Sequence, residues 1–317
     1  MAIYLTEDEV GRLIDMPTAL AAVEAAHAAL ATGDAIDIPR QRVRSGTSMQ
    51  HMLQGSWPAR GVMGYKIYTT SAAGVRFWLH LFDSRSGEPL AVMEANLLGM
   101  MRTGAAGGVA ARRLAREAAN CAGIIGAGWQ ARGQILALAC AVHVDRFKVF
   151  VRNRAKLEKF CADMSTETGC AMQAVATAQE AAEASDIIVT ATTSPVPVLE
   201  GAWLAPGMHV NAMGSNSLVR RELDEVAVGR MDVICVDGVD TALKEAGDLL
   251  PALEKGRLSA GRLLALGDLV AGFRVGRTDA QQITLFESQG MAIQDIALGF
   301  EVFQRAKSAG IGRALPY

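Results

Sequence analysis

The sequence predicts an α/β protein in which a Rossmann-type, doubly wound parallel sheet is joined to a second, α+β domain. After residue 118, short apolar strands alternate with helical stretches, which is typical of a parallel sheet. A glycine-rich turn lies between the strand at 121–125 and the helix that follows it. Between residues 36 and 95, short alternating runs separated by Gly and Pro indicate antiparallel strands instead. A length of 317 residues suits two domains.

The first part of the chain is expected to begin with helices and continue as hairpins. Thr6 precedes three acidic residues and an apolar periodic run, which predicts a helix start, and an alanine-rich helix is expected over 17–32. Strands include 61–70 and 76–84, with a hairpin turn at 84–87. A further helix is expected over 100–117.

The parallel sheet is expected to form from regularly spaced apolar segments. The predicted strands are 121–125, 146–152, 172–175, 186–192, 208–213 and 232–237. The helices predicted between them include 128–142, 154–168 and 178–185, and a long helix is expected over about 288–313.

Composition excludes several classes of function. The net charge is −2 and no long basic block is present, which argues against nucleic acid as a partner. The five cysteines have no CxxC spacing, so we expect buried thiols in a reducing compartment and no metal site. No apolar run reaches the roughly 18–20 residues of a membrane helix, and the N-terminus is too acidic for a signal peptide. A soluble, cytoplasmic protein is expected.

The turn at 126–131 has the GxGxxA pattern of dinucleotide-binding proteins. Gly126 permits the tight turn, Gly128 lets a pyrophosphate approach the backbone, and Ala131 keeps the helix close to the sheet. Trp129 and Gln130 lie within the same pattern. The helix N-terminus supplies amide groups for phosphates. We therefore expect an NAD(P) site here, an ordinary strand–helix turn being the alternative.

The second strand of this unit ends without the acidic residue that usually binds the ribose of NAD. Arg152, Asn153 and Arg154 stand there, and two guanidiniums could bind a 2′-phosphate. This favours NADP. NAD stays open, because Asn153 can also bond a ribose hydroxyl and exposed arginines often begin a helix.

The first half of the chain offers cations for an acidic substrate. Arg40, Arg42 and Arg44 alternate and would share one face of a strand. Lys66 lies in an otherwise apolar strand, where it is either outward-facing or functional with a lowered pKa. Arg102 stands where a helix is expected to start, a position unfavourable for a cation unless an anion binds there with Thr103 and Gly104.

These stretches together resemble the ornithine cyclodeaminase/mu-crystallin family. The matching segments include IPRQR, GYKIYT, MRTGAAGG, IIGAGWQA, HVNAMGSN and ITLFESQGMAIQD, in order along nearly the whole chain. The resemblance implies a Rossmann domain over 119–287 and a substrate-binding and dimerisation domain built from 1–118 plus 288–317. It also implies a cytoplasmic homodimer that uses NAD(P) on a small imino or amino acid.

The resemblance also implies the roles of individual residues. Arg42, Lys66 and Arg102 would hold the substrate carboxylate and assist proton transfer, with Thr103 beside Arg102. Residues expected to line the cofactor site or lie near the nicotinamide are Thr192, Thr193, Ser194, Asn211, Gly214, Ser215, Ser288 and Gly290.

Asn216 departs from the family pattern. Ornithine cyclodeaminases have an aspartate at the aligned position, and asparagine cannot act as a base near neutral pH. The loop of Gly214–Ser217, which on composition alone could also be a surface loop, thus becomes the floor of a site. We expect a reductase of an α-imino acid, iminosuccinate or a cyclic imine among the candidates, in which Lys66 and Asn216 act on the C=N group. The alternatives are a cyclodeaminase and a non-catalytic, mu-crystallin-like dinucleotide-binding protein.

Overall fold

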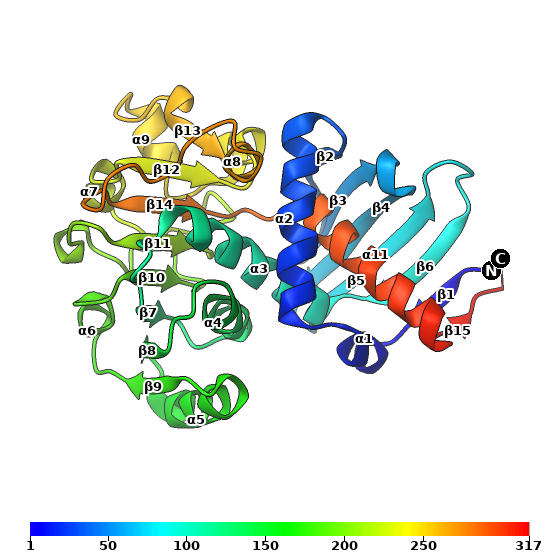
Figure 1. Cartoon of the computed structure of the whole chain (residues 1–317), viewed down its shortest axis with the longest axis horizontal. Coiled ribbons are helices and arrows are strands. Elements are labelled where there is room, and N and C mark those ends of the chain that lie inside the picture. Colours follow the sequence, from blue (N-terminus) through cyan, green and yellow to red (C-terminus); the bar gives the residue numbers. More distant parts are fainter. Residues whose placement is uncertain (317) are drawn as a thin grey trace. The chain divides into compact units, whose positions relative to one another are not determined.

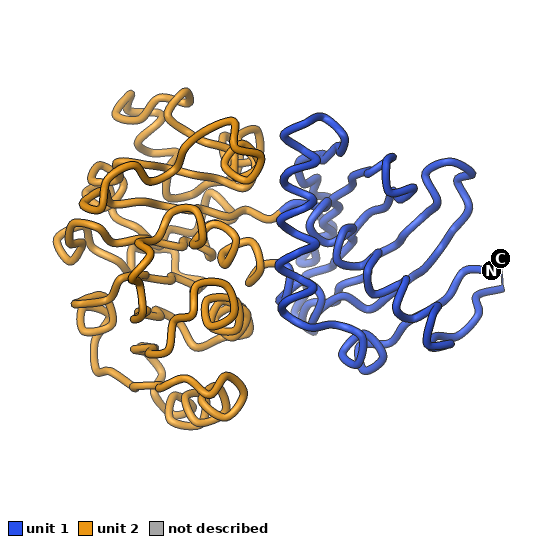
Figure 2. Tube along the Cα trace, viewed as in Figure 1, with its two compact units in different colours: residues 1–102, 291–317 blue, residues 103–290 orange. Residues whose placement is uncertain are grey.

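The computed structural model describes residues 1–316, and the chain forms two compact units. Unit 1 contains residues 1–102 and 291–317, and unit 2 contains residues 103–290 (Figure 2). The boundaries thus lie at 102/103 and 290/291, where the sequence led us to expect 118/119 and 287/288. The first boundary falls inside helix α3 (Asn96–Leu114).

Unit 1 is a seven-stranded sheet with the order β15-β1-β6-β5-β4-β3-β2. Helices α2 and α11 cross one face of this sheet, and the two chain ends lie together at its β1–β15 edge (Figure 1). The elements of this unit are β1 (Ile3–Leu5), α1 (Glu7–Leu13), α2 (Met16–Thr32), β2 (Ile36–Ser45), β3 (Ser48–Trp57), the 3-10 turn η1 (Pro58–Arg60), β4 (Val62–Ser71), β5 (Gly74–Asp83), β6 (Pro89–Glu94), α11 (Ala292–Ala309) and β15 (Arg313–Ala314).

The first helices begin where their capping residues predict. Thr6 accepts from the backbone of Glu9, and the Glu9 side chain accepts from the Thr6 backbone, which forms a capping box. Asp15 caps α2 by accepting a hydrogen bond from the Thr18 backbone. No single helix among residues 1–316 is long and apolar enough to cross a membrane; the bent pair α1 and α2 passes only when the two are taken together.

Strand alternation decides which side chains of unit 1 face the helices. On β4 the residues Val62, Gly64 and Lys66 are buried, and Met63 and Tyr65 point to the opposite face. Lys66 therefore points inward, toward α11, and is 3% exposed. The inward orientation removes the alternative of a solvated strand lysine.

Strand β2 does not keep the alternation expected for its arginines. The register with β3 shifts between Ile38 and Gln41, so a bulge separates Arg40 from the regular pairs that follow. Arg42 and Arg44 pair with His51 and Met49 and share one face. The bulge interrupts the regular alternation, but Arg40 still acts on His51, as Arg42 does, and on Lys66.

Unit 2 is an eight-stranded parallel sheet with the order β13-β12-β14-β11-β10-β7-β8-β9. Helix α4 lies on one face, and α6 and α7 lie on the other, as expected for a doubly wound fold (Figure 1). Its strands are β7 (Cys121–Ile125), β8 (Arg146–Phe150), β9 (Ala171–Ala174), β10 (Ile187–Thr190), β11 (His209–Ala212), β12 (Val233–Val236), β13 (Leu263–Ala265) and β14 (Thr284–Glu287). Its helices are the rest of α3, α4 (Trp129–Ala141), α5 (Leu157–Thr168), α6 (Ala178–Ala182), α7 (Glu225–Gly229), α8 (Val239–Glu245), α9 (Leu250–Glu254) and α10 (Leu266–Val270), with 3-10 turns η2 (Arg154–Lys156), η3 (Gly201–Trp203) and η4 (Ala260–Arg262).

The sequence analysis missed strand β14, although it lies in the middle of the sheet. β14 comes late in the chain and inserts between β11 and β12. All four of its residues are buried. It runs into the segment 288–290 that precedes α11, so the final helix begins at Ala292 and not near 288.

Helix α3 also begins earlier than expected, at Asn96 and not near residue 100. Arg102 is therefore inside the helix, and the argument that it is a cation at a helix N-terminus is wrong. Gly104 has a packing role in place of an anion-binding one, since a Cβ there would come within 2.2 Å of the Gly133 carbonyl oxygen on α4.

Candidate active site

A buried group of opposite charges lies under the N-terminal turn of α11 in unit 1. The Lys66 ammonium donates to Asp295 Oδ1 at 2.8 Å, and Arg102 Nε donates to the same oxygen at 3.2 Å. Asp295 is 0% exposed and belongs to the first turn of the helix, where a carboxylate is favoured by the helix dipole. Two cations thus share one carboxylate in the protein interior.

A second layer of polar side chains fixes the orientation of Arg102. Gln294 Oε1 accepts from Arg102 Nη1 at 2.9 Å, and the Gln294 amide nitrogen lies 3.0 Å from His27 Nε2. His27 is fully buried, and burial lowers its pKa to about 4, so its Nε2 accepts from the amide as a neutral ring. The chain of contacts from His27 to Arg102 holds the guanidinium in one position.

The environment of Lys66 makes it capable of proton transfer near neutral pH. Burial lowers the pKa of Lys66 to about 8; Asp295 opposes this shift, and Arg102 and Arg40 add to it. The ammonium also lies 5.2 Å from the centroid of the Phe77 ring. A lysine with such a pKa carries its proton at pH 7 and can release it at little cost.

Further cations surround a neutral histidine on the same face of the sheet. His51 stacks on Tyr68 with the ring centroids 4.1 Å apart, and it is 8% exposed. Burial, with Arg42 and Arg40 next in size, lowers the pKa of His51 to about 4. Two arginines beside an uncharged ring form a surface suited to an anion.

The sequence analysis missed Asp295, Gln294, His27 and His51 as members of this site. The available signal for Asp295 was a carboxylate in the apolar run 291–298, which a core helix does not bury without a partner. No local pattern marks His27, because its partner is 267 residues away.

In unit 2, the glycine loop has the geometry of a dinucleotide site. Gly126 has φ +116°, and a Cβ there would come within 2.5 Å of the Ala191 carbonyl oxygen, so both conformation and packing require glycine. At Gly128, the N-cap of α4, a Cβ would meet nothing within 4 Å. Trp129 is 43% exposed, Gln130 is half-buried and Ala131 is buried. The open backbone at the start of α4 fits a pyrophosphate.

The residues after β8 lie on the surface. Arg152, Asn153 and Arg154 are all exposed, and the Asn153 side chain accepts from the Ala155 backbone as a helix cap. No carboxylate occupies the segment 151–154. The two arginines are accessible to a ligand on this edge of the sheet.

At the carboxyl ends of β10 and β11 the expected loop residues are held by a buried glutamate. Glu222 accepts from the backbone of Thr192 and of Gly214, both at 2.6 Å. A Cβ on Gly214 would come within 2.3 Å of the Thr192 carbonyl oxygen. Packing therefore requires a glycine at position 214. Thr193 is exposed, and the Ser194 hydroxyl donates to the Val196 carbonyl.

Four other residues expected near the nicotinamide are buried and bonded inside the protein. Asn211 is 0% exposed and bonds His209, Gly107 and Gln134, so its side chain belongs to the core. Ser215 bonds Glu287. The Ser288 hydroxyl and the Gly290 backbone both donate to Asp237 Oδ2.

Asn216 lies in the loop after β11, and its side chain is half-buried. Its amide oxygen accepts from Arg220 Nη1 at 3.4 Å. This contact orients the oxygen toward the guanidinium. Arg220 would form an ion pair with an aspartate at this position.

Among residues 1–316, no group of three His, Cys, Asp or Glu side chains is arranged to hold a metal ion.

Comparisons with known proteins agree over the whole chain. The ornithine cyclodeaminase/mu-crystallin family matches residues 2–310. Alanine dehydrogenase of Archaeoglobus fulgidus is 33% identical over 326 residues, covering 99% of this chain and 98% of that protein. The structure of Thermococcus litoralis Δ1-pyrroline-2-carboxylate reductase in complex with NADH and L-proline has a TM-score of 0.95 at 32% identity, covering 99% and 100% of the two chains. An archaeal alanine dehydrogenase dimer with bound NAD has a TM-score of 0.93 at 30% identity, covering 100% and 99%.

Proposed function

The chain belongs to the ornithine cyclodeaminase/mu-crystallin family, and we propose from this premise that it reduces an α-imino acid to the L-amino acid. It is a nicotinamide-dependent oxidoreductase that acts on the C–N bond of imino or amino acids. The observation that carries the proposal is the buried cluster of Lys66, Arg102 and Asp295, since dinucleotide binding alone needs none of these side chains.

The charges of the cluster fit the substrate. Two cations and one carboxylate leave a net positive charge in a buried place, which favours binding of the α-carboxylate of an imino acid. Arg102, oriented by Gln294, is the residue that we assign to this carboxylate, with Thr103 next to it in α3. A fixed guanidinium also fixes the position of the neighbouring imine carbon.

Lys66 is proposed to keep the imine nitrogen protonated. A protonated C=N group is more electrophilic at carbon, and the bound dinucleotide supplies the hydride. With a pKa of about 8, Lys66 is an acid of suitable strength at neutral pH. Asn216 donates from its amide nitrogen to the substrate, because its oxygen accepts from Arg220. An aspartate there would be a base, and a cyclodeaminase needs one to oxidise its amine.

We further propose that the substrate carries a second carboxylate, as iminosuccinate does. Arg40 and Arg42 both act on the neutral His51, and Arg40 also acts on Lys66. Two guanidiniums beside an uncharged ring suit a second carboxylate group of the substrate. Arg42→Ala should raise KM for a dicarboxylic imino acid at least tenfold and leave KM for a monocarboxylic one within about twofold. Arg44→Ala, further along the same strand, is the matched control.

The proposed reaction is tested by following oxidation of NADH and NADPH. Suitable substrates are oxaloacetate with ammonia, pyruvate with ammonia, and preformed cyclic imino acids. Stoichiometric consumption of the cofactor is expected with at least one of them. Ammonia release from ornithine without net consumption of cofactor would establish a cyclodeaminase instead, and dinucleotide binding without either activity would indicate a binding protein.

For the cofactor, we propose a preference for NADPH over NADH. The support is the pair of exposed arginines, Arg152 and Arg154, in a segment without a carboxylate. Arg152→Ala should weaken NADPH binding at least tenfold and leave NADH binding nearly unchanged, so that NADH serves as the internal control. Equal weakening of both cofactors would contradict the preference.

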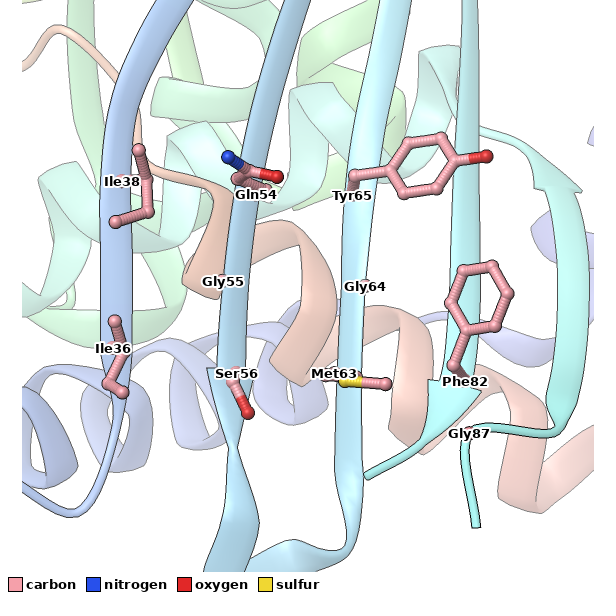
Figure 3. A pocket seen from close by; sticks show the side chains of 10 residues that line it. All are labelled: Ile36, Ile38, Gln54, Gly55, Ser56, Met63, Gly64, Tyr65, Phe82 and Gly87. Atoms are coloured by element: carbon pink, nitrogen blue, oxygen red, sulfur yellow. The ribbon is translucent and has the colours of Figure 1, made fainter. Parts of the chain in front are cut away.

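We also propose that the protein is a homodimer that pairs through the outer face of the unit 1 sheet. On the face opposite α11, a groove of about 530 Å³ is lined by residues of four neighbouring strands (Figure 3). Its lining includes Ile36 and Ile38, which are 54% and 39% exposed, with Met63 and Phe82. An apolar face of this kind is typical of a protein interface.

The interface is tested with a charge on this face. Ile38→Glu should convert a dimer to a monomer in analytical ultracentrifugation. Val196→Glu, which alters a 59% exposed residue of unit 2, is the control and should leave the mass unchanged. A wild-type monomer at micromolar concentration would refute the proposal.

A further inference from the structure

Four buried carboxyl groups meet at the carboxyl edge of the unit 2 sheet. Glu287 ends β14, Asp237 follows β12, Glu222 lies in the segment after β11, and Asp248 follows α8. Their exposed fractions are between 0 and 3%. Four like charges at this depth would repel one another strongly, so each needs hydrogen-bond donors, a cation or a proton.

Three of the four have the donors that a carboxylate needs. Glu222 accepts from the Thr192 and Gly214 backbones and from the Thr190 hydroxyl at 2.9 Å. Asp237 accepts from the backbones of 238, 289 and 290 and from the Ser288 hydroxyl. Asp248 Oδ1 accepts from two backbone N–H groups, at 222 and 223, at 2.7 and 3.0 Å. These donors favour the charged form of each group, in opposition to burial, which raises the pKa of Glu222 and of Asp248.

Glu287 differs from them in its hydrogen bonds. Its Oε1 is 2.7 Å from the Ser215 hydroxyl and 3.3 Å from the Gln289 amide nitrogen. Among residues 1–316, no group donates to Glu287 Oε2. No backbone N–H reaches either oxygen, and the residue is 0% exposed. A carboxylate in this position would be the least compensated of the four.

Asp248, like Glu287, has one carboxyl oxygen without a donor in the described part of the chain. This oxygen is Oδ2. Burial raises the pKa of Asp248, and the hydrogen bonds from two backbone groups and the Arg221 charge oppose this shift. One proton shared by the two carboxyl groups would serve both unpaired oxygens. Two buried carboxyl groups that interact electrostatically, as these do, commonly hold one proton between them.

We propose that Glu287 is a positioning residue that stays a neutral carboxylic acid at pH 7, with its proton directed to the Asp248 carboxylate. The pair holds Ser215 and with it the loop 213–217, which contains Asn216. The ionisable groups that face Glu287 are Asp248, Glu222 and Asp237, and all are acidic, so they favour the neutral form. Burial, with Asp248 next, correspondingly raises the pKa of Glu287 well above its usual value.

The state of Glu287 is tested by comparing wild type with Glu287→Gln in the absence of cofactor. Glutamine has the shape of the neutral acid and can donate to Asp248, but it does not titrate. Folded wild type keeps a proton that its unfolded chain releases above its ordinary pKa near 4.5. Between pH 5 and 8 the folded-to-unfolded ratio of wild type, divided by that of the variant, should therefore fall by up to about tenfold per pH unit.

Glu222→Gln is the matched control for the same substitution at the same depth. Glu222 accepts from three donors, and the amide nitrogen of a glutamine would point at one of them without accepting its hydrogen bond. The folded-to-unfolded ratio of Glu222→Gln should therefore drop roughly ten- to a hundredfold. For Glu287→Gln, the folded-to-unfolded ratio at pH 7 should drop by at most a few fold relative to wild type. A wild-type-to-Glu287→Gln ratio that is constant or rises between pH 5 and 8 would show that Glu287 is charged in the folded state.

Two further measurements report the protonation state of Glu287 and its positioning role. If Glu287→Gln does not fold, infrared spectroscopy of the wild type decides the question, because a carboxylic acid and a carboxylate absorb at different frequencies. Absence of a protonated carboxyl band at pH 7 would refute the neutral acid. Positioning itself is read from NADH affinity, which should weaken at alkaline pH in wild type and not in Glu287→Gln. That last readout rests on the proposed dinucleotide function, whereas the stability comparison does not.

Discussion

Unit 1 and unit 2 both bury ionisable side chains, but unit 1 combines opposite charges and unit 2 combines like ones. Lys66 and Arg102 are compensated by Asp295, and the group keeps a net positive charge. In unit 2, four carboxyl groups come together, and Glu222, Asp237 and Asp248 accept hydrogen bonds from the backbone. The difference suits the proposed ligands, because a substrate anion needs a cation whereas loops around a dinucleotide need fixed backbone positions.

The largest effect on this comparison is expected from Asp295→Ala. The substitution leaves Arg102 buried without its carboxylate, and loss of one partner of a buried ion pair costs about 3–5 kcal/mol. Urea unfolding should show this loss. Asp163→Ala, which removes the partner of Lys159 on the surface, is the control and should change stability little. A similar small change for Asp295→Ala would mean that the two cations do not depend on it.

Lys66→Met should reduce kcat/KM for imine reduction by roughly a hundredfold or more, since a general acid contributes about 10²–10⁴-fold. In wild type, kcat/KM should fall as the pH rises through about 8, because the protonated form of Lys66 is the active one and its pKa is about 8. The variant should lack this decrease. Lys159→Met, at an exposed lysine, should behave like wild type in the same pH series.

In unit 2, Asp237→Asn should cost about 2 kcal/mol, because an amide cannot accept from all the donors that Asp237 binds. The segment 288–290 would be released, and NADH affinity should fall with stability. Fluorescence titration and chemical unfolding measure the two effects. Asp240→Asn, at an exposed position in α8, is the control. Unchanged NADH binding in Asp237→Asn would separate this carboxylate from the cofactor site.

The smallest effect is expected for His51, which is uncharged in the folded state, on the pH dependence of stability. The folded state keeps His51 uncharged, because burial and Arg42 lower its pKa to about 4, whereas the unfolded chain takes up a proton below about 6.5. Stability is therefore lost as the pH falls from 6.5 to 4. His51→Phe, which preserves stacking on Tyr68, should reduce this loss by about 1 kcal/mol. The exposed His143→Asn should not.

Sequence patterns predicted those parts of the site that depend on local structure. The loop of Gly126 and Gly128 and most strands of unit 2 follow from local periodicity and turn chemistry, whereas the sequence left the orientation of Lys66 open. The bulge at Arg40 did not, because it is defined by pairing with another strand.

The remaining parts depend on distant partners. Asp295 contacts Lys66 across 229 residues, and β14 finds its place between strands that precede it by many residues. The start of α3 was placed too late because its first backbone N–H groups, at Asn96 and Leu97, donate to the side chain of Glu7, a distant residue. The reason for a glycine at position 214 also lies far along the chain. A Cβ there would clash with the Thr192 carbonyl oxygen, which follows a neighbouring strand.

The position of β14 sets the order in which the protein can mature on the ribosome. A nascent chain that ends before residue 284 has β11 and β12 without the strand that joins them, and both present unpaired edges. The same chain contains Lys66 and Arg102 but lacks the carboxylate that neutralises them. Both defects are corrected by synthesis of one short segment, residues 284–295. Truncation within it should leave both units incomplete at once, and chaperone dependence should end when this segment leaves the exit tunnel.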